Sequence, residues 1–286
     1  MIDRIKANFT SLVKYFLAIW SSLSALAGVW LTFVSWEDMG ITGRFARILI
    51  LFGIILIAVV GAAITILCRN SKRIFGDINK GTELCYGDII RIGFPKKDQR
   101  RIVVIPVNRC FDLSCEGNLI SRRSIHGQWI EKYIGNDNER VQLTNKIQQI
   151  LAERGEQFDL LHKADKCDGN LKRYRPGTVV ELAGEKNVSF YLLALSEFDK
   201  DLRAHCSEAD FYATLQGLLE YYDIHGMGED MYCPVMGDHI VRPTRDTKDI
   251  ISLMLSVLRF NRGKIHGNIH VVVYDKMKSE IPILDY

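Results

Sequence analysis

The residues best suited to bind a charged ligand lie in one stretch, from Ile102 to His126. A β-branched run, Ile102–Ile105, predicts a buried strand, and the polar residue Asn108 follows shortly after it. A polar loop then leads to a helix predicted to begin near Ser124. The first amides of a helix have no intrahelical acceptor, and the helix dipole is positive there. This stretch therefore predicts a site for an anion.

Two further stretches carry comparable patterns. Tyr86–Ile90 reads YGDII, and Tyr232–His239 reads YCPVMGDH, with a glycine in the loop that follows an apolar run. The order GD-I, strand-VN-loop, strand-P-x-x-G loop resembles that of macro domains, which bind ADP-ribose and related nucleotides. Together with an apolar N-terminal hairpin, the chain resembles the membrane-anchored macro-domain effectors of type II Thoeris antiphage defence systems.

The resemblance implies a role for each matching residue. Asp88 would accept a hydrogen bond from the adenine amine, because that amine is a donor. Asn108 would meet the distal ribose, and a helix beginning at Ser124 would hold the diphosphate with its amides. The loop Met236–Ile240 would form the second phosphate loop, in which Gly237 permits close backbone approach. The full predicted ligand-binding set is Asp88, Ile89, Asn108, Arg109, Ser124, Ile125, His126, Met236, Gly237, Asp238, His239 and Ile240.

The chain departs from the family pattern at positions that hydrolysis of ADP-ribosyl groups would require. VNRCF replaces VNAAN, so Phe111 stands in place of the second asparagine, and Ser121–Gly127 replaces a run of glycines. No general base or nucleophile remains at a matched position, so we expect binding without turnover and no catalytic residues. Two alternatives stay open: a membrane-tethered ADP-ribosyl hydrolase, and a scaffold that recruits ADP-ribosylated partners.

The elements that position these residues alternate between strand and helix from Thr82 onward. Alternation of this kind predicts an α/β fold, and the resemblance makes it a macro-like three-layer sandwich with a mixed sheet. The segment 155–176 is charged and unpatterned and is read as a loop, with an insertion near the pocket or a contact surface as the alternatives. The predicted strands are Glu83–Ile92, Arg101–Pro106, Thr178–Leu182, Val188–Leu195, Met231–Val235 and Ile269–Tyr274, and the predicted helices are Ser124–Ile134, Glu139–Arg154, Ser207–Tyr222 and Asp246–Phe260.

The N-terminal quarter predicts a transmembrane α-helical hairpin. Tyr15–Trp36 and Ile48–Cys68 contain no charged residue, and each is long enough to cross a hydrocarbon core of about 30 Å. Basic residues precede the first span and follow the second, which places both termini in the cytoplasm. Small residues at a spacing of four, such as Ala58 and Ala62, allow close helix approach within the hairpin or between protomers. The predicted segments are 1–14 (interfacial and amphipathic), 15–68 (hairpin), 69–81 (linker) and 82–286 (macro-like domain).

Composition limits the classes of ligand and partner that the chain is expected to bind. A net charge of +3, from 37 basic and 34 acidic residues, gives no reason to expect nucleic acid. The 7 cysteines form no CxxC pair, so no metal and no disulfide framework is expected. The resemblance implies an effector of the bacterial inner membrane with no cofactor. Its ligand would be an ADP-ribose derivative, histidine-ADP-ribose, made from NAD by a TIR-domain partner enzyme, and binding would drive homo-oligomerisation and membrane disruption.

Overall fold

The structure is a computed structural model that describes residues 2–237 and 246–286. The chain divides into two compact units, which we describe separately. One comprises Met1–Lys72 together with Lys276–Tyr286, and the other comprises Arg73–Asp275. Neither boundary coincides with the predicted one between 81 and 82, because the segment 69–81 contains a strand of the sheet and the segment 276–286 packs with the hairpin.

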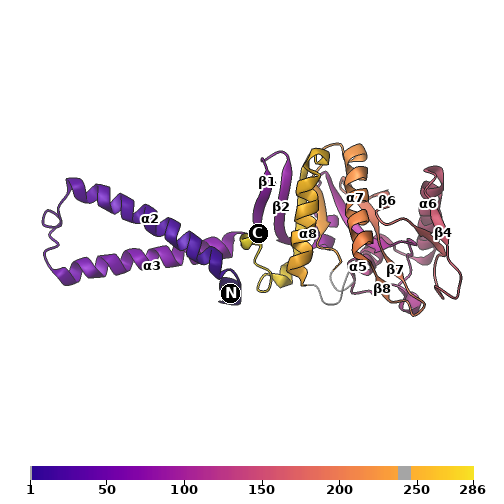
Figure 1. The fold of residues 1–286 in the computed structure, drawn as a ribbon, viewed down its shortest axis with the longest axis horizontal. Coiled ribbons are helices and arrows are strands. Elements are labelled where there is room, and N and C mark those ends of the chain that lie inside the picture. The colour runs from indigo at the N-terminus through magenta and orange to yellow at the C-terminus, as the bar shows by residue number, and fades with distance from the viewer. Residues whose placement is uncertain (1, 238–245) are drawn as a thin grey trace. The chain divides into compact units, whose positions relative to one another are not determined.

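The first unit is a helical hairpin (Figure 1), formed by α1 (Ile2–Ala7), α2 (Phe9–Phe33) and α3 (Arg44–Cys68). Both long helices are long and apolar enough to cross a membrane, judged by length and composition. Ala58, Ala62 and Ile66 of α3 are buried within the hairpin. Gly28 of α2 is exposed, and a Cβ added there would meet nothing within 4 Å. The small residues of the hairpin therefore serve two different surfaces.

The second unit is built on a sheet of order β1-β2-β10-β9-β3-β7-β6, with β8 paired to β7. The five central strands, from β2 to β7, are parallel, and β6 and β8 are antiparallel to β7. Parallel strands place their carboxyl ends at one edge. The bounds are β1 (Ser71–Gly76), β2 (Gly81–Gly87), β3 (Arg101–Asn108), β6 (Val179–Ala183), β7 (Val188–Phe198), β8 (Ala204–His205), β9 (Met231–Pro234) and β10 (Asn268–Tyr274).

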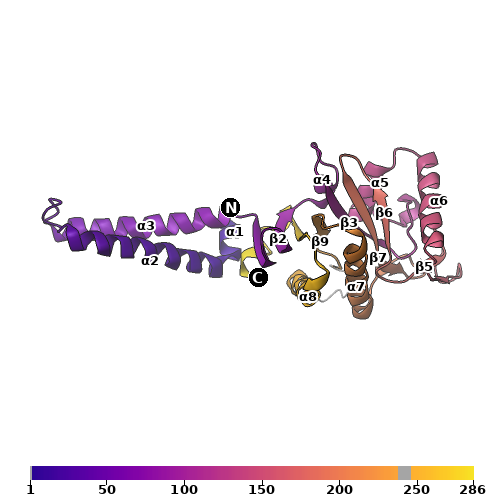
Figure 2. The same cartoon turned by 90° about the horizontal axis from the view of Figure 1, so that it is seen from above.

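Helices cover both faces of this sheet, which makes a three-layer α/β sandwich (Figure 2). The helices α4, α5 and α6 lie on one face, and α7 and α8 lie on the other. The core on the α5 side includes Val103, Ile105, Trp129 and Phe190. The bounds are α4 (Ile89–Gly93), α5 (Ile125–Tyr133), α6 (Asp137–Glu153), α7 (Glu208–His225) and α8 (Thr247–Phe260), with short 3₁₀ turns at Glu116–Asn118, Arg262–Lys264, Asp275–Met277 and Ile283–Asp285.

Two predictions about local structure were wrong. The strand predicted over Glu83–Ile92 ends at Gly87, because Oδ1 of Asp88 accepts hydrogen bonds from the amides of Ile90 and Arg91 and caps α4. The segment 155–176 is more than a loop, since β4 (Phe158–Leu160) pairs with β5 (Lys172–Tyr174) inside it. Within the same segment, the fully buried ammonium of Lys166 lies 2.7 Å from a carboxylate oxygen of Asp112.

Candidate functional site

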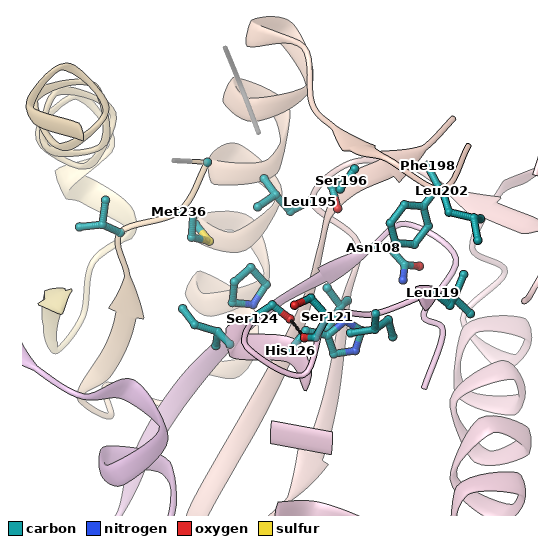
Figure 3. Close-up of a pocket in the computed structure, with 17 residues that line it drawn as sticks. Asn108, Leu119, Ser121, Ser124, His126, Leu195, Ser196, Phe198, Leu202 and Met236 are labelled. Carbon is teal, nitrogen blue, oxygen red and sulfur yellow. Dashed lines mark hydrogen bonds between the residues drawn. The ribbon is translucent and has the colours of Figure 1, made fainter. Parts of the chain in front are cut away.

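A cavity of about 460 Å³ opens at the carboxyl edge of the parallel strands (Figure 3). Its walls come from the ends of β3, β7 and β9 and from the loop that leads into α5. This is where an open α/β sheet usually holds its ligand. The lining residues are Pro106, Val107, Asn108, Leu119, Ile120, Ser121, Ser124, Ile125, His126, Leu195, Ser196, Phe198, Leu202, Ala204, Val235, Met236 and Gly237.

The N-terminus of α5 supplies the cavity with backbone donors. Ser124 is the N-cap, and its Oγ accepts a hydrogen bond from the amide of Gly127 at 3.0 Å. The amides of Ile125 and His126, the first two residues of α5, have no intrahelical acceptor. Helix geometry and the dipole therefore favour an anion here.

Gly127 sets how closely the preceding loop approaches this helix. A Cβ at Gly127 would lie 2.2 Å from the carbonyl oxygen of Ser121 and 2.8 Å from Cα of Arg122. No real side chain fits at such distances, so glycine is required for backbone packing rather than for a special φ. The chain thus has one glycine at the point where the resemblance leads one to expect a run of them.

Asn108 presents a free donor at the end of β3. Its Oδ1 accepts hydrogen bonds from the amides of Cys110 at 3.0 Å and Asp112 at 3.4 Å, which fixes the orientation of the side-chain amide. Its Nδ2 is buried and has no partner among the described residues. A buried amide nitrogen without an acceptor is costly unless a ligand completes it. Asn108 is therefore oriented to donate to a ligand oxygen.

His126 brings a second unpartnered polar atom to the same cavity. The residue is 6% exposed, and its Nε2 has no partner in the described part of the chain. Burial lowers the pKa of His126 to about 3, so its imidazole is neutral at physiological pH. A neutral ring donates or accepts a hydrogen bond but adds no charge. His126 can thus orient a ligand without acting as a counter-ion.

One end of the cavity is apolar, and sequence reasoning missed it. Leu195, Phe198, Leu202 and Ala204 line it, from the end of β7, the turn that follows and β8. Asn108 lies near Phe198 in the close-up (Figure 3). The prediction ended this strand at Leu195, whereas β7 continues to Phe198. The signal that could have revealed it is the apolar Phe198 just beyond the predicted strand end.

Several predicted residues lie outside this lining. Asp88 and Ile89 are at the carboxyl end of β2, where Asp88 caps α4 and Ile89 is buried. They share the edge with the cavity, but β10 separates β2 from β9, so Asp88 is about 10 Å from β9 across the sheet. A long ligand is needed to reach both.

Arg109 is turned into an ion-pair network instead. Its Nε donates to the carbonyl oxygen of Tyr174 at 2.8 Å, and its Nη1 lies 3.1 Å from a carboxylate oxygen of Glu197. Phe111, two residues on, is buried and has φ of 51°. That left-handed backbone is one that asparagine tolerates better than phenylalanine. The ring of Phe111 packs edge-on against Tyr174 and is not among the residues that line the cavity. It therefore does not replace the missing asparagine.

The second predicted phosphate loop is described only in part. Met236 and Gly237 line the cavity, and Gly237 has φ of 86°, which favours glycine. Asp238, His239 and Ile240 lie outside the described residues. Of the twelve predicted positions, the structure brings six together around one cavity: Asn108, Ser124, Ile125, His126, Met236 and Gly237. Within residues 2–237 and 246–286, no group of three or more His, Cys, Asp or Glu side chains could hold a metal ion.

Comparisons with known proteins agree with this architecture. Residues 82–274 match the family model described as "Thoeris protein ThsA, Macro domain". The chain is 23% identical over 246 residues to the Thoeris protein ThsA of Bacillus amyloliquefaciens (strain Y2), covering 85% of this chain and 77% of that protein.

Solved macrodomains from Oceanobacillus iheyensis are also similar. A mutant of that macrodomain with ADPR has a TM-score of 0.48 at 13% identity, over 76% of this chain and 97% of the other. The macrodomain with ADP has a TM-score of 0.47 at 15% identity, over 76% of this chain and 95% of the other. The family match covers residues 82–274, which include every strand of the sheet except β1, and it establishes the relationship. The chain belongs to the Thoeris ThsA macro-domain family, whose context is antiphage defence.

Proposed function

We propose that this protein is a ligand-gated membrane effector whose macro domain binds an ADP-ribose derivative in the cavity at the carboxyl edge. The observation that carries the proposal is the convergence of three features in one cavity. These are the amides at the α5 N-terminus, the unpartnered Nδ2 of Asn108 and the unpartnered Nε2 of the neutral His126. The first feature suits a diphosphate, and the other two suit ribose hydroxyls.

The two ends of the site suit the two ends of such a ligand. Asp88 lies about two strand spacings beyond β9, within the reach of the adenosine half of an extended dinucleotide. Its Oδ2 stays available for an adenine amine, because the two capping bonds use Oδ1. At the opposite end, Phe198 and Leu202 offer an apolar wall to whatever group the distal ribose carries. An imidazole would suit this wall, which supports histidine-ADP-ribose as the ligand.

We propose binding without turnover. The hydroxyl of Ser124 donates to the carbonyl oxygen of Ser121 at 2.7 Å while accepting the cap hydrogen bond from Gly127. Its proton and one of its two lone pairs are thus engaged, which disfavours it as a nucleophile. His126 has a pKa of about 3 and is a weak base. These features support a sensor over an ADP-ribosyl hydrolase.

The remaining steps concern the membrane. A TIR-domain enzyme would make the signal from NAD, and the two proteins would communicate only through this diffusible ligand. The hairpin helices, α2 and α3, would cross the bacterial inner membrane with both termini in the cytoplasm, since basic residues flank the ends of the hairpin. Binding would favour a homo-oligomer, and clustered hairpins would permeabilise the membrane and stop the infected cell.

Calorimetry on the full chain in detergent tests the ligand assignment. Histidine-ADP-ribose should bind more tightly than ADP-ribose, because only the former fills the apolar end of the cavity. Chromatography of the ligand after prolonged incubation should recover it intact. Quantitative conversion of the ligand to free ADP-ribose would favour the hydrolase, and the absence of binding by either nucleotide would reject the site.

A further inference from the structure

The segment 276–286 belongs structurally to the hairpin although it follows the last strand of the sheet. It is grouped with Met1–Lys72 as one compact unit. The unit boundary falls directly after Asp275, and β10 ends at Tyr274. The chain therefore crosses between the units at two places, at Lys72–Arg73 and at Asp275–Lys276. The first crossing is expected of any membrane anchor, whereas the second is not.

The contacts of this segment with the base of the hairpin are specific. Oγ of Ser11, in α2, donates a hydrogen bond to Oδ1 of Asp285 at 2.7 Å. It also lies 3.2 Å from the carbonyl oxygen of Leu284. Nζ of Lys72 donates to the same carbonyl at 2.6 Å and also to the carbonyl of Tyr286. Figure 2 shows this segment, in yellow, beside the α1 end of the hairpin.

Burial indicates that the attachment is lasting. Ile281, Ile283 and Leu284 are 2%, 0% and 5% exposed, and Ser11 is 3% exposed. Three large apolar side chains at this depth are costly to withdraw. A nucleotide can shift an equilibrium only by its difference in affinity for two states. We therefore favour a link that stays attached over a latch that ligand binding releases.

The strand that precedes this segment, β10, contacts a residue of the ligand cavity. Val235, which lines the cavity, donates its amide to the carbonyl oxygen of Val272 in β10 at 3.0 Å. Tyr274, at the end of β10, is in register with Gly87, the residue before Asp88. The polypeptide that leaves β10 at the ligand edge thus enters the hairpin base within a few residues. We propose that residues 276–286 are a mechanical coupler that transmits nucleotide binding to the membrane hairpin. This inference rests on the proposed function.

The test uses the full chain in liposomes loaded with a self-quenching dye, with histidine-ADP-ribose added outside to protomers whose macro domain faces outward. One variant carries a twelve-residue Gly-Ser insertion between Lys278 and Ser279. It keeps the connection to β10 and the contact with the hairpin base, but makes the chain between them longer and flexible. The other is Leu284→Asp, which places a charge in the buried contact. The control is Glu280→Gln, at an exposed position of the same segment.

We expect both variants to bind the nucleotide like the parent while ligand-dependent dye release falls at least about fivefold, the lower end of ordinary coupling factors. Glu280→Gln should release dye like the parent. Parental release from the insertion variant would overturn the coupler, and so would ligand-independent release from Leu284→Asp, which would indicate a latch. If Leu284→Asp does not fold, the insertion variant alone decides. A parent that binds nucleotide but releases no dye would instead reject the proposed function.

Discussion

At the scale of single residues, a substitution of Asn108 gives the clearest test of how the site binds its ligand. Asn108→Asp keeps the acceptor that holds the amides of Cys110 and Asp112, but replaces the unpartnered donor with a carboxylate. Losing a donor and placing a negative charge near a diphosphate should cost about 1–3 kcal/mol, or tenfold to a hundredfold in affinity by calorimetry. Asn138→Asp, at an exposed position of α6, adds the same charge and should bind normally. Equal affinities in the two variants would contradict the assignment of Asn108.

His126 gives the fold a predictable response to acid. Its folded pKa of about 3 lies below the unfolded value of 6.5, so the unfolded chain binds the proton more readily. Its contribution to stability is therefore complete above pH 6.5 and is lost as the pH falls towards 3. The loss should approach about 1.4 kcal/mol per pH unit.

His126→Gln removes this titration. Thermal unfolding of the full chain in detergent, followed at pH 7.5 and pH 5, should show a smaller fall in midpoint for the variant than for the parent. A parental fall in the variant would mean that other groups dominate the acid response, and that His126 is less deeply buried than the structure has it.

At the scale of elements, the turn from β3 into α5 depends on one glycine. Gly127→Ala would place a methyl group 2.2 Å from the carbonyl oxygen of Ser121 and must push the Ser121–Arg122 loop away from the helix. Because Ser121 and Ser124 line the cavity, nucleotide affinity should fall by about tenfold or more, and stability should fall by about 1–3 kcal/mol.

Gly263→Ala is the matched control, since a Cβ there would meet nothing within 4 Å. It should leave the calorimetric affinity and the unfolding midpoint almost unchanged. A Gly127→Ala variant that behaves like Gly263→Ala would show that the loop can shift at no cost to the site.

Much of the fold was predictable because its signals are local. The β-branched run Ile102–Ile105 and the cap residues Ser124, Ser207 and Asp246 mark where β3, α5, α7 and α8 begin, within one residue. The errors arise where contacts between residues distant in the sequence determine the local structure. Asp88 ends β2 by capping α4, and the buried ion pair of Lys166 joins its segment to the distant Asp112. Arginine is a residue type that usually lies on the surface. The pairing of β3 with β7 instead brings Arg109 beside Glu197, and no local sequence pattern encodes that pairing.

At the scale of the whole molecule, the hairpin has two kinds of small residue. Ala62 is fully buried within the hairpin, whereas Gly28 is exposed with open space at its Cβ position. Gly28→Leu should therefore leave the hairpin folded and interfere only with contacts between protomers. Ala62→Leu should instead disturb the packing of α3 on α2, at a cost of about 1–3 kcal/mol.

Chemical crosslinking of the two variants in membranes separates these effects. Gly28→Leu should reduce the nucleotide-dependent oligomer while nucleotide affinity and the unfolding midpoint stay parental. Ala62→Leu should lower the unfolding midpoint. If Gly28→Leu crosslinks like the parent, the outward face of α2 is not the surface on which protomers meet.

The central claim is that a nucleotide bound at the carboxyl edge of the sheet opens the membrane through the hairpin. The most direct measurement is dye release from liposomes that contain the purified full chain, with and without histidine-ADP-ribose and with no other protein present. We predict release that saturates with the nucleotide, requires Asn108 and leaves the nucleotide chemically intact. Release that is the same with and without the nucleotide, or that is unchanged in Asn108→Asp, would contradict the account.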